Sequence, residues 1–439
     1  MQNSEIIVRF PPSPTGLLHI GNVRTALYNW LFARQNQGKF IIRIEDTDKE
    51  RSKKEYEEDM LSSLAWLGLN FDNESNILRQ SERGEIYKQK IQELIQKGVA
   101  YVSKETEGEN REVVRFRNPG GKIKFDDLIR GPIEMEVGDL KDFIIARNIN
   151  EPVYHLAVVV DDLESGVTHV IRGEDHLSNT PRQILILEAL GGSRPIYAHL
   201  PLILAEDKSK LSKRKHGEAV SLKYYRDKGY GPEAIINFLA MIGWNSGTDQ
   251  DIFSLEELLK VFDISKVQKK GGIFDQKKLR WTNKEHMKLR LESTNQKIED
   301  KIKEHFSQTN IHPKLIDLVF ERIEVISDID DLVQNGELGY FFNKPDLDGS
   351  KIAWKNQSME DLKRIMNQEL RILENPLENV EKVKEELVNL AEKEGKGEVL
   401  WPLRYALSGK EKSPDPFTLI DILGIKEGQK RIQDAISKI

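Results

Sequence analysis

The sequence predicts an α/β fold, with a parallel sheet and covering helices in the front half and an all-α region in the back half. Three observations support this prediction. Short apolar strand patterns alternate with amphipathic helical patterns up to about residue 245, which is typical of a parallel sheet. A Gly- and charge-rich stretch of mostly β character, residues 103–150, interrupts the alternation. From residue 246 onward, strand patterns nearly vanish and helical periods dominate.

The first elements of the front half follow one another in a regular order. Apolar, β-branched residues predict a strand over Glu5–Phe10, which two prolines stop. Apolar residues at spacings of three and four predict an amphipathic helix from Ile20, with Gly38 as the residue just beyond its C-terminus. A second strand is expected over Lys39–Ile44 and a second helix over Ser52–Leu67.

The later elements are predicted in the same way. Within the insertion, strand pieces are expected at Val113–Phe116, Ile133–Val137 and Phe143–Ile145. The sheet is then expected to resume with a buried strand over Val153–Val160, a helix over Asn179–Leu190 and a strand over Tyr197–Leu204. In the back half, helical periods predict helices over Leu315–Ile326, Met359–Leu373 and Val380–Glu394.

Composition narrows the class of protein. Of the 439 residues, 38% are hydrophobic and 31% are charged, which fits a globular protein and excludes collagen-like, low-complexity and membrane-bundle chains. The 66 Lys and Arg residues against 72 Asp and Glu residues give a net charge of −6, so any nucleic-acid contact must use a local basic patch. The absence of cysteine excludes disulfides, cysteine-ligated zinc, iron–sulfur clusters and cysteine nucleophiles.

Neither a secretory signal nor a membrane span is expected. The N-terminus lacks the basic and apolar regions of a signal peptide. The longest apolar stretches, such as Ile235–Trp244, are far shorter than the roughly 20 residues that a membrane span needs. A cytoplasmic location without a membrane partner is therefore expected. The nine histidines show no metal-ligand spacing, so no structural metal is expected.

The segment Pro12–Asn22 joins a turn to the start of the first helix. A helix N-terminus presents unpaired backbone N–H groups and a positive dipole end, which suits a polyphosphate. Gly16 and Gly21 allow a ligand to approach the backbone, and His19 can donate a hydrogen bond to a phosphate. The alternative is an ordinary capped helix with a surface histidine. The GxGxxG pattern of dinucleotide-binding proteins is absent.

A second motif is the cationic run Lys208–Lys215, in which five of eight residues are Lys or Arg. It follows the apolar stretch Leu200–Leu204, which predicts a place at the C-terminal edge of the sheet, where open α/β folds bind ligands. The alternative is a solvated run of surface charge. Together, the two motifs indicate a site for a phosphate-bearing ligand.

Six segments, in order along nearly the whole chain, resemble segments of the glutamyl-tRNA synthetases, which are class I aminoacyl-tRNA synthetases. Pro12–Asn22 and Tyr197–Arg214 are similar to the two class I signatures. The segments similar to stretches particular to the glutamyl-tRNA synthetases are Arg43–Asp48, Ile171–Pro181, Phe274–Trp281 and Trp401–Arg404. The resemblance implies a Rossmann-like catalytic domain over 1–102 and 151–245, a short connective and acceptor-binding insertion over 103–150, a helical stem-contact domain over 246–319 and an α-helical anticodon-binding domain over 320–439.

The resemblance also implies an enzyme. It would ligate L-glutamate to the terminal adenosine of tRNA-Glu through a glutamyl-adenylate, and release AMP and pyrophosphate. ATP would bring Mg²⁺, and no zinc is expected. His19, Lys210 and Lys213 match the catalytic residues that stabilise phosphate charge. The residues that match the family's ATP site are Pro12, Ser13, Gly21, Asn22, Asp175, Leu211, Ser212 and Arg214.

Glutamate carries two carboxylates, and arginine forks bind carboxylates better than lysine does. Arg9 and Arg172 match the two arginines that face the substrate side-chain carboxylate, and Tyr154 matches a tyrosine that contacts the same group. Ser13 and Glu45 match residues near the α-amino group, where a carboxylate suits an ammonium. The alternatives are a surface ion pair worth about 0–1 kcal/mol for each arginine, and simple packing for a tyrosine at a strand start.

For tRNA, Arg404 matches a contact residue in the helical half. Either Arg322 or Glu324 stands where family members that accept only glutamate tRNA often carry an arginine. Glu324 at that point would favour a non-discriminating or tRNA-Gln-preferring enzyme. Two departures from the family pattern are Asn22, which replaces a second histidine, and a short insertion.

The expected partners are tRNA, L-glutamate and ATP, and a monomer is expected. A shortened paralogue that modifies a tRNA base, or a catalytically silent tRNA-binding paralogue, would share part of the same pattern. The helical half from about Phe320 argues against the first of these, and the retained His19 and Lys213 argue against the second.

Overall fold

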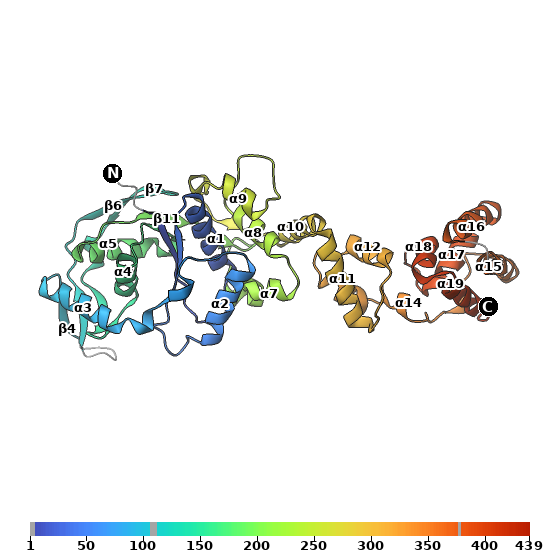
Figure 1. The fold of residues 1–439 in the computed structure, drawn as a ribbon, viewed down its shortest axis with the longest axis horizontal. Coiled ribbons are helices and arrows are strands. Elements are labelled where there is room, and N and C mark those ends of the chain that lie inside the picture. Colours follow the sequence, from blue (N-terminus) through green and yellow to red (C-terminus); the bar gives the residue numbers. More distant parts are fainter. Residues whose placement is uncertain (1–4, 106–111, 376–378) are drawn as a thin grey trace. The chain divides into compact units, whose positions relative to one another are not determined.

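The structure, a computed structural model, describes residues 5–105, 112–375 and 379–439, without the side chain of Lys213. Two compact units divide the chain, residues 1–286 and residues 287–439, and their boundary falls in helix α10 (Gln276–Leu289) (Figure 1). Of the described helices, none combines the length and the apolar character that crossing a bilayer requires.

A parallel sheet forms the centre of the first unit (Figure 1). Strand β1 (Ile7–Phe10) pairs in parallel with β2 (Lys39–Ile44), which pairs with β3 (Leu78–Arg79). Strand β10 (His169–Gly173) pairs in parallel with β11 (Ile196–Leu200). The two groups meet because the backbone N–H of Thr168 donates to the carbonyl of Ile7 at 3.0 Å. This contact places the strand that carries Arg9 beside the strand that carries Arg172.

Helix α1 (Ile20–Gln35) packs against β1, β2 and β10, and α8 (Pro232–Met241) and α9 (Leu255–Val261) pack against α1. The other helices of this unit before α10 are α2 (Lys54–Trp66), α3 (Gly84–Gln96), α4 (Tyr154–Glu164), α5 (Thr180–Ala189), α6 (Lys213–His216) and α7 (Leu222–Asp227). Buried polar side chains fix α1 in place: Asn29 Nδ2 donates to the carbonyl of Ile171 at 3.0 Å, and the Arg24 guanidinium donates to the carbonyl of Pro201. The Tyr28 hydroxyl donates to a carbonyl of α8 at 2.9 Å.

The inserted region has the expected β character. Strands β4 (Ala100–Lys104), β5 (Glu112–Phe116), β8 (Phe143–Asn148) and β9 (Glu151–Pro152) form an antiparallel sheet in that order. Strands β6 (Lys122–Asp127) and β7 (Gly131–Glu136) form a hairpin. One pairing, Asp127 with Tyr197, joins β6 to β11. The end of β6 is thereby held against the central sheet.

The expected strand over Val153–Val160 is wrong, because Val153 is the N-cap of helix α4 and the residues after it belong to that helix. Residues from Leu156 to Asp161 of this helix are all buried. A short run that is apolar on every side shows no period, so a buried helix and a buried strand look alike in sequence.

Two further expectations in the front half are corrected. The left-handed position after α1 is Gln37, with φ 54°, rather than Gly38. Gly38 is required for a different reason, because a Cβ there would lie 2.4 Å from the carbonyl oxygen of Ile6. The strand expected over 197–204 is divided into β11 and β12 (Ile203–Leu204), since Pro201 cannot donate to a strand ladder.

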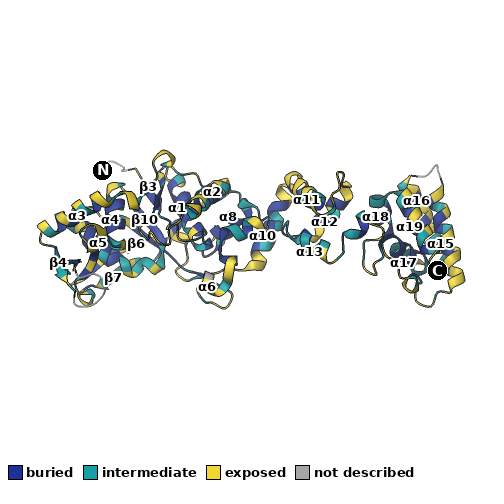
Figure 2. Ribbon diagram, turned by 90° about the horizontal axis from the view of Figure 1, so that it is seen from below, coloured by how far each residue is buried: buried dark blue, intermediate teal, exposed yellow. Residues whose placement is uncertain are grey.

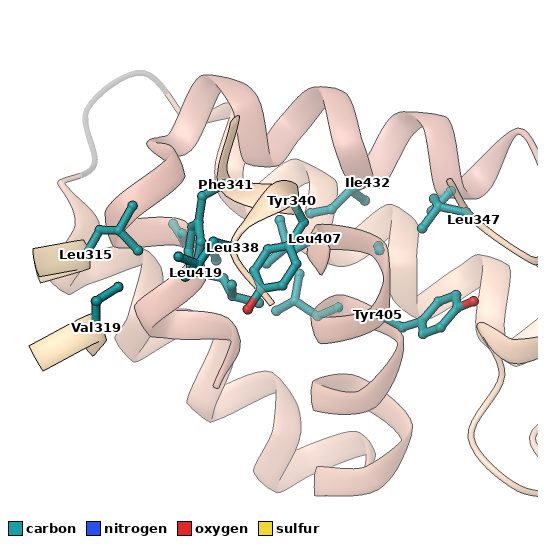
Figure 3. Packing of buried hydrophobic residues seen from close by; sticks show 14 of the residues in the cluster. Leu315, Val319, Leu338, Tyr340, Phe341, Leu347, Tyr405, Leu407, Leu419 and Ile432 are labelled. Carbon is teal, nitrogen blue, oxygen red and sulfur yellow. The ribbon is translucent and has the colours of Figure 1, made fainter. Parts of the chain in front are cut away.

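The second unit is helical and has its own apolar core (Figure 3). Its helices are α11 (Leu291–Phe306), α12 (Pro313–Arg322), α13 (Asp328–Gln334), α14 (Gly339–Phe342), α15 (Met359–Glu374), α16 (Val380–Glu394), α17 (Lys396–Ser408), α18 (Pro416–Leu423) and α19 (Ile425–Ile436). Helix α12 ends at Arg322 rather than at Ile326. Val319, Leu407 and Ile432 come from three different helices and join one buried cluster.

One carboxyl group lies inside this helical unit. Glu369 of α15 is fully buried, and neither carboxyl oxygen has a hydrogen-bond partner among the described residues. Helices α16, α17 and α19 pack against α15, whereas the outer faces of α15 and α16 are exposed (Figure 2). Burial raises the pKa of Glu369 well above its ordinary value. The folded chain therefore favours the neutral acid.

Replacing Glu369 with leucine should stabilise this unit, and more so at high pH. A carboxyl with a raised folded pKa binds its proton more tightly in the folded state. Stability therefore falls as the pH rises from about 4.3, the pKa of an unfolded Glu, toward the folded pKa. Glu369→Leu removes this loss and a buried unpaired polar group that costs about 1–3 kcal/mol. Thermal unfolding of the full chain at about pH 5 and about pH 8 measures the change.

Glu385→Leu is the matched control, because Glu385 is an exposed residue of α16. This control should leave the pH dependence unchanged. A melting temperature for Glu369→Leu below that of the parent at the higher pH would contradict the prediction.

Candidate active site

Most of the residues that the sequence singles out line one cavity of about 570 Å³ in the first unit. The cavity adjoins the carboxyl ends of β1 and β10 and the start of α1, a usual place for ligands in open α/β sheets. The predicted residues that line it are Arg9, Pro12, Ser13, His19, Gly21, Asn22, Glu45, Tyr154, Arg172, Asp175, Lys210, Leu211 and Ser212. Arg214 is not among the lining residues. The side chain of Lys213 lies outside the described part of the chain.

The start of α1 orients His19. This residue is the N-cap, and its Nδ1 accepts a hydrogen bond from the backbone N–H of Gly21 at 2.9 Å. Nδ1 therefore carries no proton, and in the neutral ring Nε2 carries it. Burial, followed by the charge of Lys210, lowers the pKa of His19. The ring is thus a neutral N–H donor at the N-terminus of α1, where the helix dipole favours negative charge.

The cationic run is tied to the sheet. Leu211 is buried, and its N–H donates to the carbonyl of Ile203 at 3.1 Å. The next charged group along the cavity is Lys210, whose Nζ lies 3.1 Å from Oδ2 of Asp175. Burial would raise the pKa of Asp175. The hydrogen bond from Lys210, with the charges of His176 and Lys210, outweighs burial and lowers this pKa. Both side chains are exposed at this end, so each can exchange its partner for a charged ligand.

Arg172, on another wall of the cavity, is a buried cation held by neutral groups. Its Nε donates to Nε2 of His199 at 3.2 Å, and its Nη1 donates to Oε1 of Gln183 at 2.7 Å. Its Nη2 donates to Oγ1 of Thr180 at 2.8 Å and to the carbonyl of His176 at 3.5 Å. Burial lowers the pKa of Arg172, yet a guanidinium stays charged in proteins. A buried cation that the described chain leaves without a carboxylate is a place for an anion.

Arg9 lines the same cavity and has an unused donor. Its side chain is 1% exposed, and its Nε donates to both carboxylate oxygens of Asp162 at 3.2 Å. Its Nη1 is buried and has no hydrogen-bond partner among the described residues. Both arginines are buried, so the alternative that they form surface ion pairs is wrong.

A network of buried charges holds Arg9 from behind. Arg43 Nη1 donates to Oδ1 of Asp162 at 2.5 Å, and its Nη2 donates to Oε1 of Glu45 at 3.0 Å. Burial would raise the pKa of Asp162, but Arg9 and Arg43 outweigh it and lower the value. Burial raises the pKa of Glu45, against the opposing effect of Arg43. Glu45 remains on the cavity wall, where it can accept from a ligand ammonium.

Tyr154 lines the cavity from a helix instead of the expected strand. It is the first residue of α4 and is 38% exposed, so the alternative that it only packs in the core is wrong. Its hydroxyl lies 3.0 Å from Nδ1 of His176. Burial, then the charge of Arg172, lowers the pKa of His176 to about 4, so His176 is neutral at neutral pH. The hydroxyl and the ring form a polar, uncharged part of the wall.

Sequence reasoning missed the residues that hold these side chains, namely Arg43, Asp162, Gln183 and His199. Their burial depends on packing between distant segments, which no local pattern reports. One signal was available: Asp161 and Asp162 interrupt the end of an apolar run, and carboxylates in a buried segment are almost always paired.

The residues expected to contact tRNA lie in the second unit. The guanidinium carbon of Arg404 lies 4.9 Å from the ring centre of Trp401, and Arg404 Nη2 donates to a backbone carbonyl at 2.8 Å. Arg322 is the last residue of α12 and pairs with Glu337 at 3.2 Å. Glu324 follows just beyond that helix. The local fold is compatible with either Arg322 or Glu324 as the discriminating position.

Comparison with known proteins finds family matches in both units of the chain. The family model for the catalytic domain of the class I tRNA synthetases (E and Q) matches residues 5–112 and 102–281. The model for an anticodon binding domain matches residues 290–436. A glutamate tRNA ligase from Elizabethkingia meningosepticum, whose crystal structure contains its amino acid, superposes with a TM-score of 0.88 at 32% identity and covers 99% of both chains.

Curated relatives agree over nearly the full length. The chain is 38% identical to the glutamate--tRNA ligase of Carboxydothermus hydrogenoformans, over 97% of this chain and 99% of that ligase. It is 39% identical to the glutamate--tRNA ligase of Francisella tularensis, over 99% of both. The catalytic-domain model matches more than half of the chain, and the relatives align along nearly all of it. The cavity is lined by residues of both signatures. The chain therefore belongs to the glutamate--tRNA ligases, a family of class I tRNA synthetases.

Proposed function

We propose that this chain ligates L-glutamate to the terminal adenosine of tRNA-Glu, using ATP and releasing AMP and pyrophosphate. The observation that carries this proposal is the anion site in the cavity. Arg172 is buried without an acidic partner, and Arg9 presents a buried Nη1 that no described residue uses. Two guanidinium groups in that state favour a ligand with a carboxylate side chain.

Glutamate would bind with its side-chain carboxylate on Arg9 and Arg172, and with the Tyr154 hydroxyl beside them. Its ammonium would face Glu45, with Ser13 nearby on the cavity wall. The α-carboxylate would then be left toward the start of α1, where the nucleotide is expected. Charge complementarity thus supports one orientation of the amino acid, because reversing it would place the ammonium on two cations.

ATP would occupy the end of the cavity formed by the start of α1 and the cationic run. Pro12, Gly21, Asn22, Asp175, Leu211 and Ser212 line that space, and Mg²⁺ would arrive with the nucleotide. An oxygen of the α-carboxylate would attack the α-phosphorus, and the bond to the leaving pyrophosphate would break. His19 Nε2–H would donate to the phosphate, while Lys210 and Lys213 would balance the charge of the departing pyrophosphate. Arg214 lies outside the cavity lining, so its proposed contact is with the outer phosphates.

In the second step, the 2′-hydroxyl of the terminal adenosine would attack the activated carbonyl and displace AMP. For the tRNA itself, the proposed division is a catalytic domain over 1–102 and 151–245, an acceptor-binding insertion over 103–150, a stem-contact domain over 246–319 and an anticodon-binding domain over 320–439. Arg404 and Arg322 would contact the tRNA. The proposal includes a cytoplasmic, monomeric enzyme.

Aminoacylation tests the proposal directly. The full chain is incubated with ATP, radiolabelled glutamate and separate tRNA-Glu or tRNA-Gln transcripts. Charging of tRNA-Glu alone is expected. Charging of tRNA-Gln as well would assign the discriminating position to Glu324, with Glu324→Arg as the variant that should restore selectivity. Failure to charge either tRNA would contradict the proposed function.

Replacing His19 with asparagine should keep its role as the N-cap of α1 but remove its hydrogen bond to the reacting phosphate. Asparagine is a strong N-cap, so α1 should keep its stability. Its shorter amide does not reach as far as Nε2, so a donor to the developing phosphate charge is lost. Removing one such donor typically lowers kcat by about 10²–10³-fold. ATP–pyrophosphate exchange in the presence of tRNA measures the effect, and unchanged exchange would exclude His19 as that donor.

Replacing Arg9 with lysine should weaken glutamate binding while ATP binding is kept. Lysine retains the charge but cannot donate to Asp162 and to a substrate carboxylate in the fork geometry. A lost hydrogen bond to a charged group is worth about 1.5–3 kcal/mol, so the KM for glutamate should rise about 10- to 100-fold. Steady-state aminoacylation with varied glutamate, then varied ATP, measures both constants.

Arg34→Lys is the matched control for Arg9→Lys. Arg34 also pairs with a carboxylate, Asp72, at 2.8 Å, but it does not line the cavity. The control should leave both KM values unchanged. An equal rise in the two constants for Arg9→Lys would indicate a general distortion of the cavity instead of a contact with glutamate.

A further inference from the structure

A chain of hydrogen bonds runs from the inserted region to the guanidinium of Arg172. Asp127, the last residue of β6, accepts from Nδ1 of His199 through its Oδ2 at 2.6 Å. The other ring nitrogen of His199, Nε2, lies 3.2 Å from Nε of Arg172. Asp127 and His199 are both buried, and neither lines the cavity. They therefore have no direct contact with a ligand in the cavity, and His199 reaches the cavity wall through Arg172, with Thr180 Oγ1 also 3.1 Å from its Nε2.

The partners of Asp127 determine which nitrogen of His199 carries the proton. Oδ2 of Asp127 also accepts the backbone N–H of His199 at 3.0 Å, and Oδ1 accepts the N–H groups of Ile129 and Arg130, each at 2.9 Å. Burial would raise the pKa of Asp127, but the bond to His199 and these backbone N–H groups outweigh it and lower the pKa, so the side chain is ionised. The Nδ1 that faces Oδ2 must carry a proton. Burial lowers the pKa of His199, so the ring is neutral and its Nε2 presents a lone pair to Arg172.

With that tautomer, each nitrogen of the Arg172 guanidinium has an acceptor. His199 takes Nε–H, Gln183 takes Nη1 at 2.7 Å and Thr180 takes Nη2 at 2.8 Å. A planar group bound at three points cannot rotate about its long axis. In the other tautomer, Nε2 of His199 would carry a proton and could donate it to Thr180 Oγ1 at 3.1 Å, but it could no longer accept from Nε–H of Arg172, and the plane would lose one of its three fixed points.

We propose that Asp127 and His199 are positioning residues that fix Arg172 toward the side-chain carboxylate of glutamate, and that they thereby contribute to the choice of glutamate over glutamine. The inference rests on the proposed function of Arg172. The bonds to His199, Gln183, Thr180 and His176 leave one N–H of Nη1 for a ligand. A donor held in one direction matches a carboxylate, which accepts at both oxygens, whereas an amide offers one acceptor and one donor. A guanidinium free to turn could move aside for the amide nitrogen, and the difference between the two amino acids would shrink.

The contrast between two variants of His199 tests this. A glutamine side chain can place Oε1 near the position of Nε2, and so keeps the acceptor for Arg172. An asparagine side chain can place Nδ2 near the position of Nδ1, and so keeps the bond to Asp127 but leaves Arg172 Nε without an acceptor. For His199→Asn the KM for glutamate should rise about tenfold or more, the change expected when a hydrogen bond to a charged group is lost. The KM for ATP should not change, and kcat/KM for glutamate relative to glutamine should fall.

His199→Gln should recover most of the glutamate KM and of the selectivity, which a purely structural role would not produce. His169→Asn provides the matched control, because His169 is a buried histidine of β10 whose Nδ1 bonds to its neighbour Thr168 at 2.9 Å. If His199→Asn does not fold, Asp127→Asn is tested for the same changes in the KM for glutamate and in selectivity. An amide cannot accept on both sides, so the turn N–H groups or the His199 proton must lose a partner.

Arg172→Lys, measured in the same aminoacylation assay on the full chain, distinguishes a failure of the proposed role of Arg172 from a failure of the positioning role alone. If Arg172→Lys leaves the KM for glutamate unchanged, the proposed role of Arg172 fails, and the inference with it. If Arg172→Lys raises that KM but His199→Asn and Asp127→Asn do not, the positioning role alone is overturned. Equal changes in the KM values for glutamate and ATP, without recovery in His199→Gln, would also overturn it. A selective change that His199→Gln reverses supports it.

Discussion

A buried cation without an acidic partner sets the character of the cavity. Taking a guanidinium out of water costs several kcal/mol unless a counter-charge repays it. Arg9 and Arg43 obtain that compensation inside the protein, because they share Asp162. Arg172 obtains only neutral hydrogen bonds, so its charge remains available to whatever enters. The fold thus holds a buried positive charge without a counter-charge at the point where an acidic amino acid would bind.

The ends of the cavity differ in how tightly they are built. The side chains around Arg9 and Arg172 are buried and joined by hydrogen bonds from β1, β10, α4 and α5. At the nucleotide end, Lys210 and Asp175 are exposed and bonded mainly to each other. A rigid arrangement suits discrimination between similar small ligands, since it penalises a wrong donor pattern. Exposed long side chains suit phosphates, whose charge moves as the reaction proceeds.

Much of this could be predicted from the sequence, because the informative features are local. The strand, turn and helix around residues 7–35 follow from apolar spacing and from two prolines, and the cationic run is visible as composition. The helix α4 was missed because a fully buried segment has no polar face to reveal its period. The supporting residues were missed for a related reason. Asp127 and His199 meet across 72 positions of sequence, so only the packed sheet brings them together.

The attachment of α1 also bears on how the site assembles. Arg24, Tyr28 and Asn29 bond to carbonyls that lie 177, 212 and 142 positions further along the chain. The helix that begins just after His19 precedes these docking partners in the chain, so the partners are made later. During synthesis, α1 can form early from local contacts, whereas the cavity beside it must wait until residues near 242 have left the ribosome. The first signature motif is thus made well before the segments on which its function depends.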